Sequence, residues 1–154
     1  MSHAARINLF GFARASRQAM IALSGSAKES SLGPRLVELV NLRVSQINGC
    51  GLCIDMHWRD LVKQEVEPRH LNAVAGWREA PFFSAREKAA LRWAEAVNAI
   101  PSSAPSDADF AELREHFSEE EIVQLGYAIA AIRGWNMLNV SLHTQIPEVP
   151  PPGM

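Results

Sequence analysis

The sequence predicts an all-α fold, a single-domain bundle of six or seven helices that takes in residues 1–154. Two observations lead to this prediction. Apolar residues recur at the spacing of a helix through most of the chain, and no alternating strand pattern persists. In addition, Ser84 with Glu87 and Ser118 with Glu121 form capping boxes, which are typical of helix starts. A chain of this length can bury one substantial core.

The N-terminal third predicts two helices joined by a loop. Residues 3–23 carry a loose apolar stripe that suits a helix, and the Ser- and Gly-rich residues 24–33 are expected to form a loop. Pro34 suits the first turn of the next helix, over residues 34–48. That helix places one apolar face at Leu36, Leu39, Val40, Val44 and Ile47.

The rest of the chain is divided by glycine, proline and the two capping boxes. After Gly49, a helix is expected from near Cys50 to about Gln64, and Pro68 opens a short one. The first capping box opens a longer helix that ends before Pro101. The remaining helices start at Ser106 with Asp109, reaching about His116, and at the second capping box, which opens the longest apolar helix. The Pro-rich tail, residues 146–154, is expected to be extended.

Composition and charge argue against several function classes. The formal net charge is −2, from 15 basic against 17 acidic residues, so we expect neither a nucleic acid nor a membrane surface as a partner. No apolar run approaches the roughly 18 residues that a membrane helix needs. Arg6, Arg14 and Arg17 interrupt the apolar N-terminal part, which argues against a secretory signal. Two cysteines make no disulfide scaffold, and a cytoplasmic location is expected.

Both cysteines lie in one short stretch, NGCGLCIDMH, residues 48–57. On a helix that begins near residue 50, Cys50, Cys53 and His57 occupy positions i, i+3 and i+7 and therefore share a face. The positive end of the helix dipole favours a thiolate there, and the spacing also permits a disulfide. A thiolate is the form of cysteine that attacks peroxides and disulfides.

Glu38 is a candidate partner for His57. It lies in an apolar part of the helix over residues 34–48, where a carboxylate is costly to bury unless it is paired. That helix is expected to run antiparallel to the cysteine helix after the tight Asn48–Gly49 turn, so that its inner face could meet His57. A Glu–His–Cys proton relay is the resulting hypothesis.

Other interpretations remain open for these residues. The two cysteines could be ordinary core side chains, or they could bind a structural zinc ion together with His57 and Glu38. Structural zinc more often takes two separated pairs of ligands, so we expect no metal. A thioredoxin-like CxxC would need a βαβ setting, and the sequence lacks strands.

Polar and aromatic residues outside this stretch are given structural roles. Asn139 and His143 could line a site near the last long helix, but we expect both to be structural. Residues 119–121, all glutamate, suit a helix start and a solvated face. No role is assigned to Asp55 or Met56. Four tryptophans are expected in the core or at a subunit interface: Trp58, Trp77, Trp93 and Trp135.

A family resemblance rests on four residues and their spacing. Eleven residues separate Glu38 from Cys50, two separate Cys50 from Cys53, and three separate Cys53 from His57. Together with its flanks, ELVNLRVSQINGCGLCIDMH, this pattern resembles the AhpD-like alkylhydroperoxidases of the carboxymuconolactone decarboxylase superfamily. The specific resemblance covers about residues 33–77, with a weaker similarity in the last long helix, YAIAAIRGWNMLNVSL. The superfamily's decarboxylases generally lack the cysteine pair, so lactone decarboxylation is not expected.

The resemblance implies an all-helical, usually oligomeric protein that reduces hydroperoxides or disulfides through its thiols. By carry-over, Cys53 is the peroxidatic thiolate and Cys50 the resolving cysteine, while Glu38 and His57 form the proton relay. No bound cofactor is expected. An external dithiol, such as a lipoyl group or a thioredoxin-like protein, would reduce the disulfide. Some relatives carry a histidine between the cysteines, where this chain has Gly51 and Leu52.

A different class of function remains as the alternative. The chain could be a redox-sensing or stress-linked interaction module that is catalytically slow and whose disulfide alters contacts between copies of the chain. Self-association is expected in either case, because apolar helix faces point to several sides of one small helical unit.

Overall fold

The computed structural model describes residues 4–150. Within that range the chain forms seven α-helices and two short 3-10 turns, with no β-strand. The all-α prediction is therefore confirmed. The helices are α1 (Arg14–Glu29), α2 (Pro34–Asn48), α3 (Gly51–Lys63), α4 (Pro68–Asn72), α5 (Ala85–Asn98), α6 (Asp107–Arg114) and α7 (Glu119–Ser141). The 3-10 turns are η1 (Leu9–Gly11) and η2 (Ala73–Gly76).

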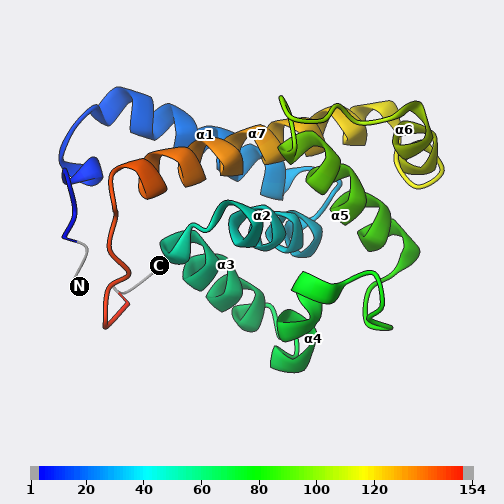
Figure 1. The fold of residues 1–154 in the computed structure, drawn as a ribbon, viewed down its shortest axis with the longest axis horizontal. Coiled ribbons are helices and arrows are strands. Elements are labelled where there is room, and N and C mark those ends of the chain that lie inside the picture. The colour runs from blue at the N-terminus through cyan, green and yellow to red at the C-terminus, as the bar shows by residue number, and fades with distance from the viewer. Residues whose placement is uncertain (1–3, 151–154) are drawn as a thin grey trace.

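Helix α2 is the centre of the fold. It packs against α1, α3, α5 and α7, and Figure 1 shows it surrounded by these helices. Nine of its residues are buried, including Leu39, Val40 and Val44 of the predicted apolar face. Ile47, the last residue predicted for that face, is 44% exposed because it lies in the last turn of the helix, beside the Gly49 turn. Glu38, the candidate catalytic residue of α2, is one of these buried residues and therefore lies in the interior.

Helix α1 differs from the prediction at both ends. It begins at Arg14, after η1, and it continues through Ser24 to Glu29, where a loop was expected. The serines are tolerated because their hydroxyls bond back to helix carbonyls: Ser24 Oγ donates to Met20 O at 2.9 Å. Packing on α7 adds to this, since Trp135 Nε1 donates to Ser24 Oγ at 3.0 Å. Tertiary contacts thus override the loop-like composition.

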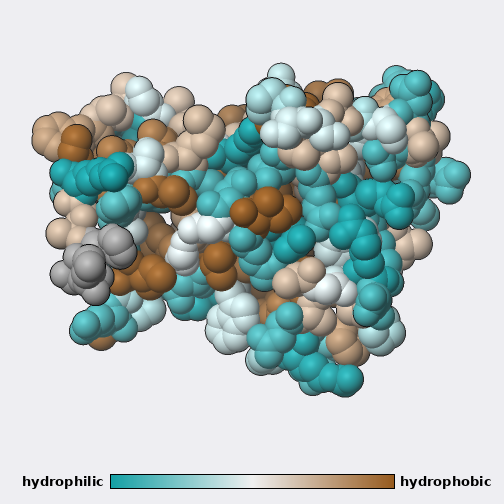
Figure 2. Space-filling view, viewed as in Figure 1, coloured by the Kyte–Doolittle hydropathy of each residue, from teal (hydrophilic) through white to brown (hydrophobic). Residues whose placement is uncertain are grey.

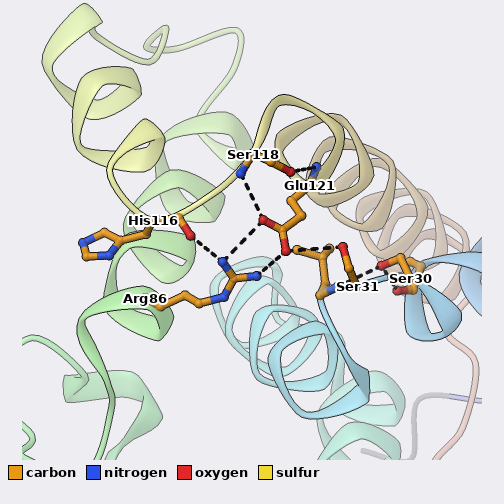
Figure 3. Close-up of polar contacts among 8 residues, drawn as sticks. Ser30, Ser31, Arg86, His116, Ser118 and Glu121 are labelled. Atoms are coloured by element: carbon orange, nitrogen blue, oxygen red, sulfur yellow. Dashed lines mark hydrogen bonds and ion pairs between the residues drawn. The ribbon is translucent and has the colours of Figure 1, made fainter.

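The capping boxes predicted for α5 and α7 are both present, and α6 has one of its own at Ser106. The α7 box is also a junction between elements (Figure 3). Glu121 accepts from Ser118 N at 3.0 Å, from Arg86 Nη2 of α5 at 2.7 Å and from Ser31 Oγ at 3.3 Å. Arg86 and Ser118 lower the pKa of Glu121 to about 2. Glu121 is thus a partner in an ion pair, whereas the sequence predicted only a helix start and a solvated face for residues 119–121.

The core consists of two clusters of buried side chains. One contains both cysteines with residues of α2, α5 and α7, and the other gathers Trp77 and Phe83 with residues of α2, α3 and α5. Trp93 and Trp135 pack partly buried against the first cluster and Trp58 against the second, so the tryptophans do contribute to the core.

Some large apolar side chains remain on the surface. Figure 2 shows such groups on the side where the N-terminal segment, the end of α7 and the start of α3 come together. Exposed apolar residues of the N-terminal segment and of the segment after α7 include Ile7, Phe10 and Ile146. Self-association of the chain stays a prediction. None of the helices in the described range is long and apolar enough to span a membrane. Residues 146–150 belong to no helix, as expected, and the rest of the tail lies outside the described residues.

Candidate active site around the cysteine pair

A tight turn between α2 and α3 positions the two cysteines. Gly49 ends α2 in the left-handed region, with φ at 70°, and Cys50 N donates to Ser45 O at 3.1 Å. Glycine adopts this conformation without the strain that a side chain would bring. Cys50 is then the N-cap of α3 and forms a disulfide with Cys53, at a Cα–Cα distance of 5.3 Å. The pair lies in the core, each residue 1% exposed.

In the oxidised pair, the amide end of α3 contacts the sulfur of Cys50. Cys53 N donates to Cys50 Sγ at 3.3 Å. The reason is the helix register: Cys50 is the N-cap and Cys53 is the third residue of the helix, so the cap side chain accepts this bond. Cys53 lies in the first turn of α3, where the helix dipole also favours negative charge.

The same turn brings Glu38 of α2 against His57 of α3. Glu38 Oε2 lies 2.5 Å from His57 Nδ1, and the two residues are 0% and 4% exposed. Burial acts to raise the pKa of Glu38, but the hydrogen bond and charge of His57, followed by the ion pair with Lys28, outweigh it. The net pKa lies below the usual value, so Glu38 is held as a carboxylate.

Lys28, near the end of α1, completes this charged group. Its Nζ contacts Glu38 Oε1 and lies 3.7 Å from Asp60 Oδ2 of α3. Sequence reasoning missed Lys28 because it falls in the stretch expected to be a loop. Only the run of helix-compatible residues up to Glu29 could have indicated that Lys28 lies on α1.

The same carboxylates bear on the question of a metal ion. Ligand atoms of Glu38, His57 and Asp60 lie within 4.8 Å of one another. The ammonium of Lys28 already supplies a positive charge to both carboxylates of this group. The zinc hypothesis also called on both cysteines, and here their sulfurs are bonded to each other. The donor set therefore fits an internal ion pair better than a zinc site.

His57 and Cys53 line one cavity of about 380 Å³. Its walls come from η1, α1, α2, α3 and α7. They are mostly apolar, with Ile21, Val37, Leu52, Met56, Ile132 and Trp135 among them. In the described part of the chain, His57 Nε2 is a buried atom with no hydrogen-bond partner. Because Nδ1 is held by Glu38, this second ring nitrogen is available to a group in the cavity. Met56, to which no role was given, is a wall residue.

Asn139 of α7 is a site residue that sequence reasoning assigned to structure. Its Nδ2 donates to Cys53 Sγ at 3.6 Å and to Trp135 O at 2.9 Å. A donor beside this sulfur stabilises negative charge on it. No local pattern links the two residues, because they are 86 positions apart. The candidate site is thus assembled from four helices, and the catalytic roles predicted for Glu38, Cys50, Cys53 and His57 stay predictions.

Comparisons with known proteins agree with this architecture. Residues 14–96 match the model of the carboxymuconolactone decarboxylase family. The uncharacterized protein YdfG of Bacillus subtilis is 34% identical over 137 residues, which is 89% of this chain and 93% of YdfG. A crystal structure from Agrobacterium tumefaciens has a TM-score of 0.90 and 36% identity, over 95% of this chain and 100% of that one. That protein is of unknown function and is provisionally named the antioxidant defence protein AhpD.

A more distant structure shares the fold alone. The debrominase Bmp8 in its apo form is 22% identical, with a TM-score of 0.76 over 84% of this chain and 70% of that one. The evidence for the family comes from the sequence matches, since the family model spans more than half of the chain and YdfG is matched over nearly all of its length. With its CxxC pair and AhpD-like fold, this chain belongs to the carboxymuconolactone decarboxylase family.

Proposed function

We propose that this protein is a thiol-dependent peroxidase that reduces alkyl hydroperoxides through Cys50 and Cys53. The observation that carries the proposal is the shared cavity: Cys53 and the unpartnered Nε2 of His57 line the same apolar space, and Glu38 holds the other face of the imidazole. A nucleophile, a base and an orienting carboxylate are the parts that activation of a thiol requires. The likeness to the Agrobacterium protein named for antioxidant defence supports the same class of chemistry.

In the first step, His57 Nε2 takes the proton of the Cys53 thiol. Glu38 accepts a hydrogen bond from Nδ1–H of the ring and stabilises the imidazolium that forms. The Cys53 thiolate attacks one peroxide oxygen, an S–O bond forms and the O–O bond breaks. The leaving alkoxide takes the proton from His57 Nε2 and departs as an alcohol. Cys53 is now a sulfenic acid, oxidised by two electrons.

In the second step, the sulfur of Cys50 attacks the sulfur of the sulfenic acid. The S–O bond breaks, water leaves, and the Cys50–Cys53 disulfide forms. In the disulfide the two Cα atoms are 5.3 Å apart, a distance that suits this bond, and the cysteines lie on adjacent turns of one chain segment. An external dithiol then returns both sulfurs to thiols, so the cycle requires no bound cofactor.

Stopped-flow oxidation of the reduced full-length protein by cumene hydroperoxide tests the proposal. We expect Cys53→Ser to abolish the reaction, and Cys50→Ser to keep the first attack while losing the intramolecular disulfide in the mass spectrum. Wild-type turnover in Cys53→Ser would overturn the assignment. A wild-type rate no better than that of a free thiol, with an altered oligomeric state on oxidation, would instead favour a redox sensor.

A further inference from the structure

Asn41 of α2 is a buried amide to which the proposed reaction gives no role. The residue is 6% exposed, and its Oδ1 has no hydrogen-bond partner in the described residues. Its Nδ2 donates to none of them either. An amide buried without partners is costly unless a ligand satisfies it. Because Asn41 lines the apolar cavity together with Cys53 and His57, a molecule in that cavity can be this ligand.

Apart from the ring of His57, the other polar groups in the wall of this cavity are already engaged. Asn139 uses its Nδ2 on the site sulfur and on a backbone oxygen, which leaves it an acceptor alone. The hydroxyl of Ser24 donates to a helix carbonyl and accepts from a tryptophan indole. The ammonium of Lys28 contacts one carboxylate and lies near a second. Among the described wall residues, Asn41 is therefore the one that offers both a free donor and a free acceptor.

The register of the two helices places Asn41 level with the reacting sulfur. Glu38 of α2 is paired with His57 of α3, and α3 runs back along α2 from the turn at Gly49. From that pair, Asn41 lies three residues nearer to the turn and Cys53 four residues nearer. At about 1.5 Å per residue, these steps are about 4.5 Å and about 6 Å along the two helices. The amide and the sulfur therefore meet the same part of the cavity.

A hydroperoxide group complements a primary amide. Its terminal oxygen carries the O–H donor, and the oxygen bound to carbon is an acceptor on the adjacent atom. The amide of asparagine likewise presents a donor and an acceptor side by side. Asn41 Oδ1 can thus accept from the peroxide O–H while Nδ2 donates to the oxygen bound to carbon. That second oxygen is the one that leaves when the O–O bond breaks.

The charges at this cavity favour a substrate without charge. Lys28 is the one lysine or arginine among the described wall residues, and no aspartate or glutamate is among them. Its ammonium contacts Glu38 Oε1 and lies 3.7 Å from Asp60 Oδ2. A carboxylate on the substrate would therefore meet an ammonium that two carboxylates already neutralise. It would also lose water to apolar walls, which is costly for an unpaired ion.

We infer that Asn41 is a catalytic residue that binds the peroxide group of an uncharged organic hydroperoxide and donates to its leaving oxygen. The inference rests on the proposed function and adds to it a residue and a substrate class. A donor aimed at charge that develops in the transition state typically contributes about 10²- to 10³-fold to the rate.

The step balances with Asn41 in this role. The Cys53 thiolate forms an S–O bond to the terminal oxygen, which keeps its hydrogen. The O–O bond breaks, and its electron pair stays on the oxygen bound to carbon. This oxygen accepts the hydrogen bond from Asn41 Nδ2 while negative charge builds on it, and it then takes the proton from His57 Nε2. Cys53 ends as a sulfenic acid, and the peroxide, reduced by two electrons, leaves as an alcohol.

Two reactions of Cys53 separate this role from activation of the thiol. In a Cys50→Ser background, the reduced full-length protein is mixed with cumene hydroperoxide or with methyl iodide. The same sulfur attacks both reagents, but departing iodide needs no hydrogen bond. We expect Asn41→Leu to slow the peroxide reaction by about 10²-fold and to leave methylation within about twofold of the rate with Asn41 in place. An unchanged peroxide rate, or an equal loss in both reactions, would overturn the inference.

Two further variants serve as controls for this comparison. Asn72→Leu removes an amide from an exposed position outside the cavity and should keep both rates. Asn41→Ala opens space instead of filling it, so it should lose the peroxide reaction as Asn41→Leu does. A normal peroxide rate in Asn41→Ala would mean that leucine merely obstructs the cavity, and the role of the amide would be refuted.

Stability gives a readout of the opposite sign. A buried amide without protein partners does not stabilise the folded state, so the midpoint of urea unfolding in Asn41→Leu should equal or exceed that of the wild-type protein. A residue with a structural role would behave in the reverse way. A midpoint well below the wild-type value would therefore contradict the role of Asn41 as a binding group.

The substrate class is tested with two hydroperoxides of matched shape, 4-methylcumene hydroperoxide and 4-carboxycumene hydroperoxide. The wild-type protein should react with the uncharged compound at least about tenfold faster at pH 7. Comparable rates, or a faster reaction with the carboxylate, would remove the requirement for an uncharged substrate.

Binding is measured apart from turnover in a protein that carries both Cys50→Ser and Cys53→Ser. Binding of cumene hydroperoxide is followed through the indole N–H signal of Trp135, a wall residue, in NMR spectra. Asn41→Leu should weaken this binding by about tenfold. If the wild-type protein reacts slowly with peroxide yet binding depends on Asn41, the proposed function fails and the binding site stands. If the wild-type protein reacts rapidly and Asn41→Leu changes neither binding nor rate, the inference fails and the proposed function stands.

Discussion

Glu38 Oε2 and His57 Nδ1 lie 2.5 Å apart inside the protein, although the two residues are 19 positions apart in the chain. The contact joins α2 to α3 across the tight turn at Gly49. It fixes the orientation of the imidazole and leaves Nε2 to the cavity that Cys53 also lines. The chemistry proposed for this protein depends on that orientation.

Replacing Glu38 with Gln tests the carboxylate as a positioning group. The amide keeps the shape but removes the charge that stabilises a protonated His57, so peroxide-driven formation of the disulfide should slow by about 10²- to 10⁴-fold. Glu29→Gln, which alters an exposed carboxylate at the end of α1, should have no effect. The rate is followed by stopped-flow with cumene hydroperoxide at several pH values. An unchanged rate in Glu38→Gln would remove the relay from the mechanism.

Replacing Lys28 with Met should shift the pH dependence of the same reaction. Lys28, His57 and Asp60 are the charged or titratable groups that face Glu38, and the first two lower its pKa. Without the ammonium, the pKa of Glu38 rises, so the carboxylate takes up a proton at a higher pH. Because the relay needs the ionised form, the acidic limb of the rate profile should move to higher pH.

The control for this shift is Lys63→Met. Lys63 lies 3.3 Å from Asp60 Oδ1 and its side chain is 55% exposed, so its loss removes a nearby surface charge without touching Glu38. We expect its acidic limb to coincide with that of the wild-type protein. If both variants moved the limb equally, long-range electrostatics would account for the result, and Lys28 would have no specific part in it.

Much of this arrangement could be predicted from the sequence because it is local. Pro34 and Gly49 mark the ends of α2, and the turn at Gly49 forces α3 to run back along it, which places Glu38 near His57. The capping boxes gave the starts of α5 and α7 correctly, since each depends on two residues three positions apart.

The remainder depends on how distant helices meet, and periodicity does not carry that information. Asn139 reaches Cys53 only because α7 crosses the start of α3. Lys28 was not predicted as a site residue because the composition of residues 24–33 is typical of a loop. Serines of this stretch nevertheless fit a helix, because their hydroxyls donate to helix carbonyl oxygens. The start of α3 near Cys50 could be predicted, but not which sulfur accepts the bond from Cys53 N, because that depends on the geometry of the cap.

Replacing Asn139 with Leu should lower the reactivity of Cys53. The substitution keeps a side chain of similar size but removes the donor that lies 3.6 Å from the sulfur. We expect alkylation of Cys53 by iodoacetamide, measured in a Cys50→Ser background at pH 7, to slow by about tenfold. The companion measurement is alkylation of Cys50 in a Cys53→Ser background. An equal loss at both sulfurs would indicate a general disturbance of α7 and would contradict donation to Cys53.

The Arg86–Glu121 ion pair should contribute stability that disappears in acid. The bonds from Arg86, and then from Ser118, lower the folded-state pKa of Glu121 to about 2, against a usual value of 4.5. A lowered pKa means that the folded state favours the carboxylate. The contribution is therefore fully present above pH 4.5 and is lost as the pH falls from there towards about 2.

Glu121→Gln isolates this charge, because glutamine can still close the capping box with Ser118. We expect its free energy of unfolding in urea to fall by about 1 kcal/mol near neutral pH, with the gap to the wild-type protein closing between pH 4.5 and about 2. Glu119→Gln removes a charge from the same helical turn, where the side chain is 88% exposed, and should show little loss at any pH. A gap that stays constant down to pH 2 would mean that Glu121 stabilises α7 through its shape, and the junction with Arg86 would then contribute nothing as an ion pair.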